Sequence, residues 1–158
     1  MSTEQVQAYL DAHDTGLHVI EPEADTSTVV AAAAALGVEP AQIAKTLALR
    51  AGHDRLLLVT GGLARLDNAR FRARFGAKPT MLRPAEVQEF VEQPIGGVSP
   101  FGHPDSTPIY CDESLRDFDI VYPAGGSPRS AVRIGTEYLA ELVGAQWVHV
   151  TRSADESR

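Results

Sequence analysis

The stretch Ile43–Thr60, IAKTLALRAGHDRLLLVT, decides which folds this chain can adopt. Up to Arg50 the apolar side chains alternate with a period of two, which predicts a strand. After the turn residues Gly52–Asp54, the run Leu56–Val59 is apolar without interruption, as expected of a strand buried on both faces. The sequence therefore predicts a hairpin made of two strands.

Helices and short strands are expected on both sides of this hairpin. The expected helices cover residues 3–13, a segment from Thr26 or Ser27 to Leu36, residues 68–75 with Asp67 as the cap, a segment beginning at Pro84, and residues 137–143. The expected short strands cover residues 17–20, 80–82, 109–111, 118–122, 131–134 and 146–150. Because strands and helices do not alternate regularly, we expect an α+β fold with a curved mixed sheet rather than a doubly wound parallel sheet.

The composition fits a single globular domain. The chain has 158 residues, of which 44% are hydrophobic and 22% charged, which is enough for one core. We expect residues 1–151 to form this domain and residues 152–158 to form a flexible tail. The first residues lack the pattern of a secretion signal, and no apolar run reaches membrane-spanning length. A cytoplasmic protein without membrane contact is therefore expected, with the single cysteine, Cys111, as a small strand residue.

The charge pattern limits what the protein can bind. The formal net charge is −7, which argues against DNA binding or any affinity gained by wrapping a long nucleic acid, but leaves room for contact with one RNA end. Six basic residues gather in one short span: Arg65, Arg70, Arg72, Arg74, Lys78 and Arg83. This span is either a solvated helix face or a surface that touches phosphates.

Lys45 stands on the more apolar face of the first hairpin strand, together with Ile43 and Leu47. An ammonium group in this position must either reach water at the strand end or project into a polar cavity. The sequence leaves both possibilities open.

The run Gly96–Gly102, GGVSPFG, predicts a rigid loop with N–H groups available to a ligand, because its glycines and Pro100 exclude a helix or a central strand. Gly102 comes one residue too late for a GxSxG nucleophile elbow. Ser99 is therefore expected to orient a substrate or to bond within its own turn. If Lys45 reaches this loop, a cation and several amides converge, which suits a carbonyl, carboxylate or phosphate and would stabilise an oxyanion.

The other polar residues give weaker signals. The five histidines form no HExxH pattern, so no metal site is expected. His103 adjoins the glycine loop and is either a surface imidazole or part of the site. Asp67 and Asp112 are expected as a helix cap and a turn or cap residue, with pairing to Lys45 as the alternative for each.

Two segments in this order, QIAKTL at residues 42–47 and GGVSPFG at residues 96–102, resemble the YbaK/EbsC family. Further matching segments are Leu36–Val38, Arg65–Asp67, Asp112–Leu115 and Ala124–Gly125, so the resemblance spans about residues 28–147. It implies a mixed, barrel-like sheet flanked by helices. It also implies a trans-acting aminoacyl-tRNA deacylase, similar to the editing domain of bacterial prolyl-tRNA synthetases, that hydrolyses the ester of tRNA mischarged with a small amino acid.

The resemblance further implies the site and its partners. No cofactor or metal is required, and a water assisted by a ribose hydroxyl of the terminal adenosine attacks the ester. The implied partner is the aminoacylated acceptor end of tRNA. The negative net charge suggests that tRNA contact is either confined to this end or aided by an aminoacyl-tRNA synthetase as a second partner. The implied catalytic residues are Lys45, Gly96, Gly97 and Ser99, and the implied substrate-binding residues are Thr46, Val98, Pro100, Phe101, Gly102 and His103.

Two other functions fit the same residues. A binding module on this fold would capture an aminoacyl or nucleotide end, or a protein partner, without turnover. A metabolic enzyme would cleave a small acyl or phosphate ester independently of tRNA.

Overall fold

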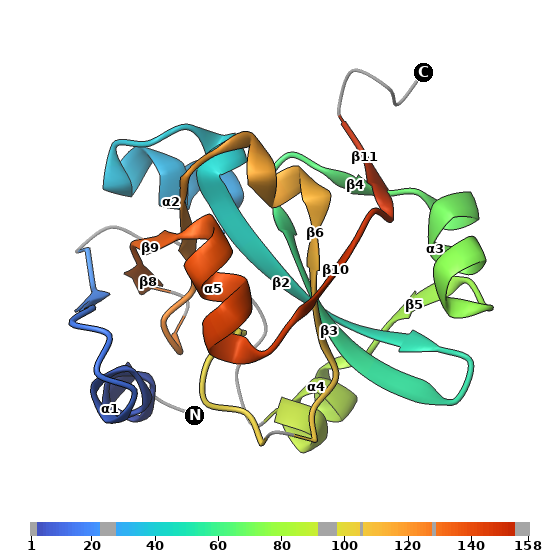
Figure 1. Ribbon diagram of the computed structural model, residues 1–158, viewed down its shortest axis with the longest axis horizontal. Helices are drawn as coiled ribbons and strands as arrows, with labels where there is room; N and C mark the ends of the chain where they lie inside the picture. Colours follow the sequence, from blue (N-terminus) through green and yellow to red (C-terminus); the bar gives the residue numbers. More distant parts are fainter. Residues whose placement is uncertain (1–2, 23–27, 92–97, 105, 128, 154–158) are drawn as a thin grey trace.

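The hairpin predicted from the sequence is the centre of the protein. The computed structural model describes residues 3–22, 28–91, 98–104, 106–127 and 129–153. In it, β2 (Ile43–Ala51) and β3 (Asp54–Gly61) run antiparallel along their whole length, with Lys45 opposite Thr60. Figure 1 shows these two strands as the longest in the molecule.

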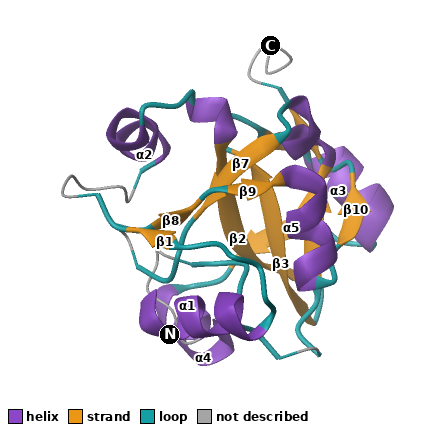
Figure 2. Cartoon of the chain, turned by 60° about the vertical axis from the view of Figure 1, so that its left-hand side comes forward, coloured by secondary structure: helices purple, strands orange, loops and turns teal. Residues whose placement is uncertain are grey.

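Short strands extend the hairpin into a curled, mixed sheet. They are β5 (Pro79–Met81), β6 (Ile109–Asp112), β7 (Ile120–Pro123), β9 (Ile134–Gly135) and β10 (Gln146–Val148). The strand order is β10-β6-β3-β2-β7-β9, and β5 also pairs with β2. The β3–β6, β6–β10 and β2–β7 pairs are parallel and the others antiparallel. The sheet closes partway into a half-barrel with helices around it (Figure 2), which confirms the expected fold class.

Two small antiparallel ribbons complete the strands. One joins β1 (Val19–Ile20) to β8 (Ala131–Val132), and the other joins β4 (Arg65–Leu66) to β11 (Thr151–Arg152). Arg152, which the sequence places in the tail, is therefore paired with a strand. Residues 154–158 lie outside the described residues.

The helices cover the sheet and confirm most of the predicted boundaries. They are α1 (Thr3–Ala12), α2 (Val29–Leu36), α3 (Asn68–Phe75), α4 (Pro84–Val91) and α5 (Thr136–Val143), with short 3-10 turns η1 (Pro40–Gln42) and η2 (Glu113–Asp117). Asp67 caps α3 as predicted, because its Oδ1 accepts from Arg70 N at 3.0 Å. Within the described part of the chain, no helix combines the length and apolar character needed to cross a bilayer.

Two predicted elements differ from the structure. The cap of α2 is Thr28, whose Oγ1 accepts from Ala31 N at 3.1 Å, rather than Thr26 or Ser27. The strand predicted for residues 131–134 is divided at the exposed Arg133, because β8 pairs with β1 whereas β9 pairs with β7. The division of the strand could not be predicted from local pattern, since it depends on partners distant in sequence, whereas the cap of α2 is a local choice among neighbouring hydroxyl residues.

The core lies on both faces of the hairpin. Ala44, Ala48, Leu57 and Val59 belong to the larger cluster on one face. A second cluster on the other face consists of Leu49, Ala51, Leu56, Leu58, Phe71, Val148 and Val150. The uninterrupted apolar run of β3 is thus explained, since consecutive side chains enter two different cores.

Cys111 is a buried residue of the larger cluster. Burial is the main cause that raises the pKa of its thiol to about 12, with a smaller contribution from the charge of Asp112. The thiol therefore stays protonated near neutral pH, as expected of a small structural strand residue.

Asp112 attaches the C-terminal segment to the sheet. Its carboxylate is fully buried and accepts hydrogen bonds from Ser114 N at 2.9 Å, Val150 N at 2.8 Å and Thr151 Oγ1 at 2.6 Å. This confirms the expected turn-capping role. The bonds to residues 150 and 151 are an additional role that the sequence does not reveal.

We predict that Asp112→Asn lowers the free energy of unfolding by about 2–3 kcal/mol, because an amide NH2 would then face a buried N–H donor. Urea unfolding followed by the fluorescence of Trp147, the single tryptophan, measures the change. The matched control is Asp117→Asn, an exposed carboxylate nearby, which should change stability by less than about 0.5 kcal/mol. Equal unfolding midpoints for the two variants would contradict the role given to Asp112.

Candidate functional site

Strand β2 has an open edge at its centre. Along one side it pairs with β3 throughout. Along the other side, β7 pairs with Ile43 and Ala44, and β5 pairs only from Leu49 onward. Among the residues that the structure describes, Lys45–Leu47 therefore have a ladder partner on one side only. The sheet is open at Thr46.

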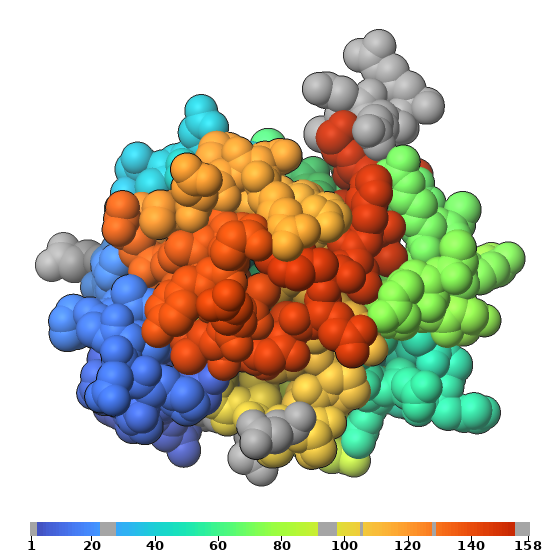
Figure 3. Space-filling view, viewed as in Figure 1, coloured from blue at the N-terminus to red at the C-terminus, as the bar shows by residue number. Residues whose placement is uncertain are grey.

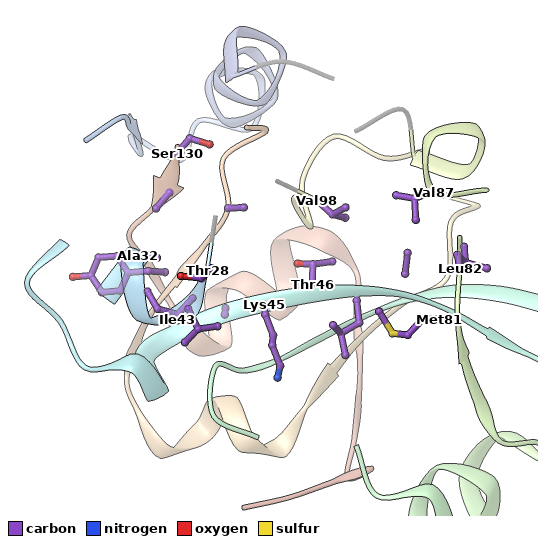
Figure 4. Close-up of a pocket in the computed structure, with 17 residues that line it drawn as sticks. Thr28, Ala32, Ile43, Lys45, Thr46, Met81, Leu82, Val87, Val98 and Ser130 are labelled. Atoms are coloured by element: carbon purple, nitrogen blue, oxygen red, sulfur yellow. The ribbon is translucent and has the colours of Figure 1, made fainter. Parts of the chain in front are cut away.

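A pocket of about 310 Å³ lies at this opening. It is formed by β2, by α2 and α4, by the end of the glycine loop and by the segment around β8 (Figure 4). The described lining residues are Thr28, Val29, Ala32, Ile43, Ala44, Lys45, Thr46, Leu47, Ala48, Met81, Leu82, Val87, Val98, Tyr122, Ala124, Ser130 and Ala131. Most are small or aliphatic, and the short side chains of Ala44 and Ala48 on β2 leave the space unfilled.

Thr46 projects from β2 on the side where Val98 lies (Figure 4). Its Oγ1 is buried and has no hydrogen-bond partner among the described residues. A buried hydroxyl without a partner costs free energy, and such groups occur where a ligand completes them. By contrast, Thr28 caps α2, and Ser130 Oγ accepts from Gly125 N and Ser127 N.

Lys45 projects from the opposite face of β2 (Figure 4). Its Nζ donates to Ala64 O at 2.8 Å. Burial is the main cause that lowers the pKa of this ammonium group, and the nearby charge of Arg65 lowers it further. Val98, in the described part of the glycine loop, lies on the Thr46 side of β2, so the Lys45 ammonium points away from it (Figure 4). Lys45 and Thr46 both line the pocket, but consecutive side chains of a strand point to opposite faces, so the Lys45 ammonium lies away from the Thr46 hydroxyl.

The described part of the glycine loop begins at Val98, since Gly96 and Gly97 lie outside the described residues. Val98 lines the pocket. Ser99 is fully buried, and its Oγ accepts from Phe101 N at 3.1 Å. This geometry favours the turn hydrogen bond among the two roles expected for Ser99. Phe101 is also fully buried, 6.1 Å from the ring of Tyr9, so it anchors the loop in the core.

Pro100, Gly102 and His103 border a different pocket, of about 340 Å³, near α1 and the end of α5. The Nε2 of His103 lies 2.6 Å from Ser99 O, and burial lowers the pKa of its imidazole, an effect that the bond to Ser99 partly offsets. Together with Phe101, these residues are not among those that line the pocket at Thr46. Of the loop residues expected to bind substrate, the structure brings only Val98 beside Thr46.

Several lining residues have no signal in the sequence that points to the site. Ala48, Val87 and Ser130 come from three separate elements, and none carries a recognisable motif. The available signal was the alternation of alanine with larger residues in β2, which marks a face with unfilled space. No group of three or more metal-binding side chains occurs among the described residues.

The family model for the aminoacyl-tRNA editing domain matches residues 23–142. This chain belongs to that family. The expected relationship to YbaK-like proteins is thus confirmed, and the match includes β2, the glycine loop and the pocket-lining segment around β8.

Individual relatives agree with this assignment. The chain is 37% identical to the uncharacterized protein YwhH of Bacillus subtilis (strain 168), over 96% of this chain and 98% of the relative. A crystal structure described as a candidate trans-editing enzyme for prolyl tRNA synthetase is 35% identical, with a TM-score of 0.87 and coverage of 96% and 97% of the two chains. The crystal structure of the hypothetical protein APE2540 is 28% identical, with a TM-score of 0.85 over 94% of this chain and 99% of the other.

We predict that Thr46→Val keeps the free energy of unfolding unchanged or raises it by up to about 1 kcal/mol, because it removes a buried hydroxyl that has no partner. The matched control is Thr60→Val. Thr60 is also buried, but its Oγ1 donates to Gly61 O at 3.1 Å, so this variant should lose about 1 kcal/mol. Urea midpoints of the two variants make the comparison. A loss at Thr46 as large as at Thr60 would show that the Thr46 hydroxyl is bonded within the protein.

Proposed function

We propose that this protein is a trans-acting aminoacyl-tRNA deacylase that hydrolyses the ester of tRNA mischarged with a small amino acid. The observation that carries the proposal is the small apolar pocket with a buried, unpartnered Thr46 hydroxyl at an open strand edge. Membership of the editing-domain family and the likeness to the candidate trans-editing enzyme support it. Such an enzyme would meet charged tRNA in the cytoplasm, alone or beside a synthetase.

The pocket suits the side chain of a small amino acid. Its volume of about 310 Å³ is at the small end of the range for ligand sites. Ala48, Val87 and Val98 supply apolar walls. The Thr46 hydroxyl would then bond to the carbonyl or the amino group next to the side chain. Because one methylene changes binding by only about 1–3 kcal/mol in such a pocket, size would separate large side chains from small ones much better than small ones from each other.

The position of Lys45 supports a role at a phosphate rather than at the ester carbonyl. The carbonyl must lie near the Thr46 side if the amino-acid side chain fills the pocket, whereas Lys45 Nζ lies on the other face of β2. A substrate that passes the open edge of β2 would present its aminoacyl group to one face and the phosphate of its terminal adenosine to the other. Lys45 would exchange its bond to Ala64 O for that phosphate.

The chemical step is hydrolysis by a positioned water. The oxygen of water adds to the ester carbonyl carbon, and the bond from this carbon to the ribose oxygen breaks. One proton of the water goes to the leaving ribose oxygen, which becomes a hydroxyl, and the other is released to solvent as the amino acid leaves as its carboxylate. The glycine-loop amides, including those of Gly96 and Gly97, are the proposed donors to the oxyanion. Fixed orientation and oxyanion stabilisation then supply most of the catalysis.

We predict that the wild-type protein deacylates at least one tRNA in a panel charged with alanine, cysteine, serine or proline. Lys45→Ala should lower kcat/KM by about 10–100-fold, because the phosphate of the terminal adenosine loses a charged hydrogen-bond donor worth about 1.5–3 kcal/mol. Lys78→Ala is the matched control, because Lys78 is the other lysine of the chain and is exposed.

Ala48→Val should narrow the pocket and lower the rate of deacylation more for cysteine or proline than for alanine. Single-turnover release of the labelled amino acid measures each rate.

Two results would contradict this proposal. If the folded wild-type protein cleaves none of the four esters, a binding module without turnover is the better description. If Lys45→Ala and Lys78→Ala cleave equally fast, Lys45 has no part in the reaction.

A further inference from the structure

The ribbon formed by β4 and β11 places two arginines side by side. Arg65 and Arg152 are directly opposite each other in its antiparallel register. The adjacent pair faces the protein, since Leu66 packs on the second core cluster and Thr151 Oγ1 donates to Asp112. Arg65 and Arg152 therefore share the opposite face of the ribbon. Like charges directly opposite in a ladder are destabilising.

Among the described residues, no acidic side chain forms a salt bridge with this pair. The exposed Arg65 has no ion pair or side-chain hydrogen bond with the residues that the structure describes, and Arg152 Nε is buried without an acceptor among them. Asp67 is near enough to feel the charge of Arg152, but the hydrogen bond from Arg70 N is the main cause that lowers the pKa of its carboxyl. Asp67 thus serves mainly as the cap of α3.

Lys45 adds a third positive charge close to the ribbon. Its Nζ bonds to the carbonyl of Ala64, the residue before Arg65. The charge of Arg65 also lowers the pKa of Lys45, so the Lys45 ammonium lies near the arginine pair, on the face of β2 opposite to the Thr46 hydroxyl.

A cleft of about 510 Å³ borders Arg152 and Ala64. It lies where η2, β11 and the end of β3 meet, and Figure 1 shows β4 and β11 side by side near α3. In the space-filling view, the C-terminal strand (red) is at the surface between α3 (green) and the η2 region (orange) (Figure 3). Two carboxylates also line the cleft. Glu113 forms a salt bridge with Arg116 at 2.8 Å. The exposed carboxylate of Asp117 would repel an anion, so an anion would bind on the side of the cleft that the ribbon forms.

We propose that Arg65 and Arg152 bind a phosphodiester of the single-stranded 3′ end of tRNA. The proposal rests on the proposed function, because the aminoacyl group in the Thr46 pocket identifies the RNA. The terminal nucleotide would use Lys45, so the arginine pair requires a further phosphate along the same strand. A polynucleotide supplies that phosphate and a free mononucleotide does not.

Binding of uncharged tRNA tests this proposal without relying on turnover. Fluorescence anisotropy of end-labelled tRNA over a range of salt concentrations should show that Arg65→Gln weakens binding and makes the slope of log Kd against log salt shallower by about 0.7–1. Arg152→Gln should do the same, and AMP should compete poorly. The matched control is Arg72→Gln. Arg72 is exposed on α3, two residues after Arg70, so its side chain points about 200° around the helix axis from that of Arg70. Arg70 donates to Thr151 O, so Arg72 faces away from β11.

A kinetic comparison separates this proposal from the deacylase proposal. Arg65→Gln should raise KM for charged tRNA several-fold with little change in kcat, and should leave hydrolysis of an aminoacyl-adenosine lacking phosphates unchanged. The unfolding midpoints of the variants show whether a substitution has damaged the fold. Arg65→Gln changes an exposed side chain, so this variant tests the proposal even if Arg152→Gln does not fold. Arginine-dependent tRNA binding without hydrolysis would support this site and overturn the deacylase. Hydrolysis with an unchanged KM and salt slope, or equal effects of Arg65→Gln and Arg72→Gln, would overturn the arginine site.

Discussion

The antiparallel ladder between β2 and β3 is the constraint on which the rest of the structure depends. It fixes which side chains of β2 enter each face, so Thr46 must point to one side of the sheet and Lys45 to the other. A shift of the register by one residue would exchange these two faces and move the alanines out of the pocket floor. The other edge of β2 is open at the site, because β5 and β7 each pair with only part of this strand.

A second fixed point, the carboxylate of Asp112, connects the sheet to the C-terminal ribbon. Its three hydrogen bonds hold Val150 and Thr151 beside η2, and β11 then pairs with β4. The position of Arg152 opposite Arg65 follows from this attachment. A buried carboxylate at the end of β6 thus determines where positive charge collects on the surface.

The parts of the structure that the sequence predicts well are those determined locally. The β2–β3 hairpin and the helix α3 follow from periodicity, from a capping Asp67 and from the left-handed Gly76 that ends the helix. The site is predicted less well, because it is assembled from distant segments. Alternation alone places Lys45 and Thr46 on opposite faces, yet no local pattern shows which face the glycine loop covers. The buried position of Ser99 and the separate pocket at His103 likewise depend on contacts with residues far along the chain.

The overall charge and the local charge act in opposite directions on an RNA substrate. A net charge of −7 repels the phosphate backbone as a whole. In the proposed binding mode, attraction comes from the region of Lys45, Arg65 and Arg152, where the described side chains form no salt bridge with an acidic residue. A substrate would therefore gain affinity only at its acceptor end, where the aminoacyl group can also enter the apolar pocket. Such a distribution makes binding depend on the ester and its nearest phosphates rather than on the body of the tRNA, so tRNAs of different sequence would be treated alike when they carry the same amino acid.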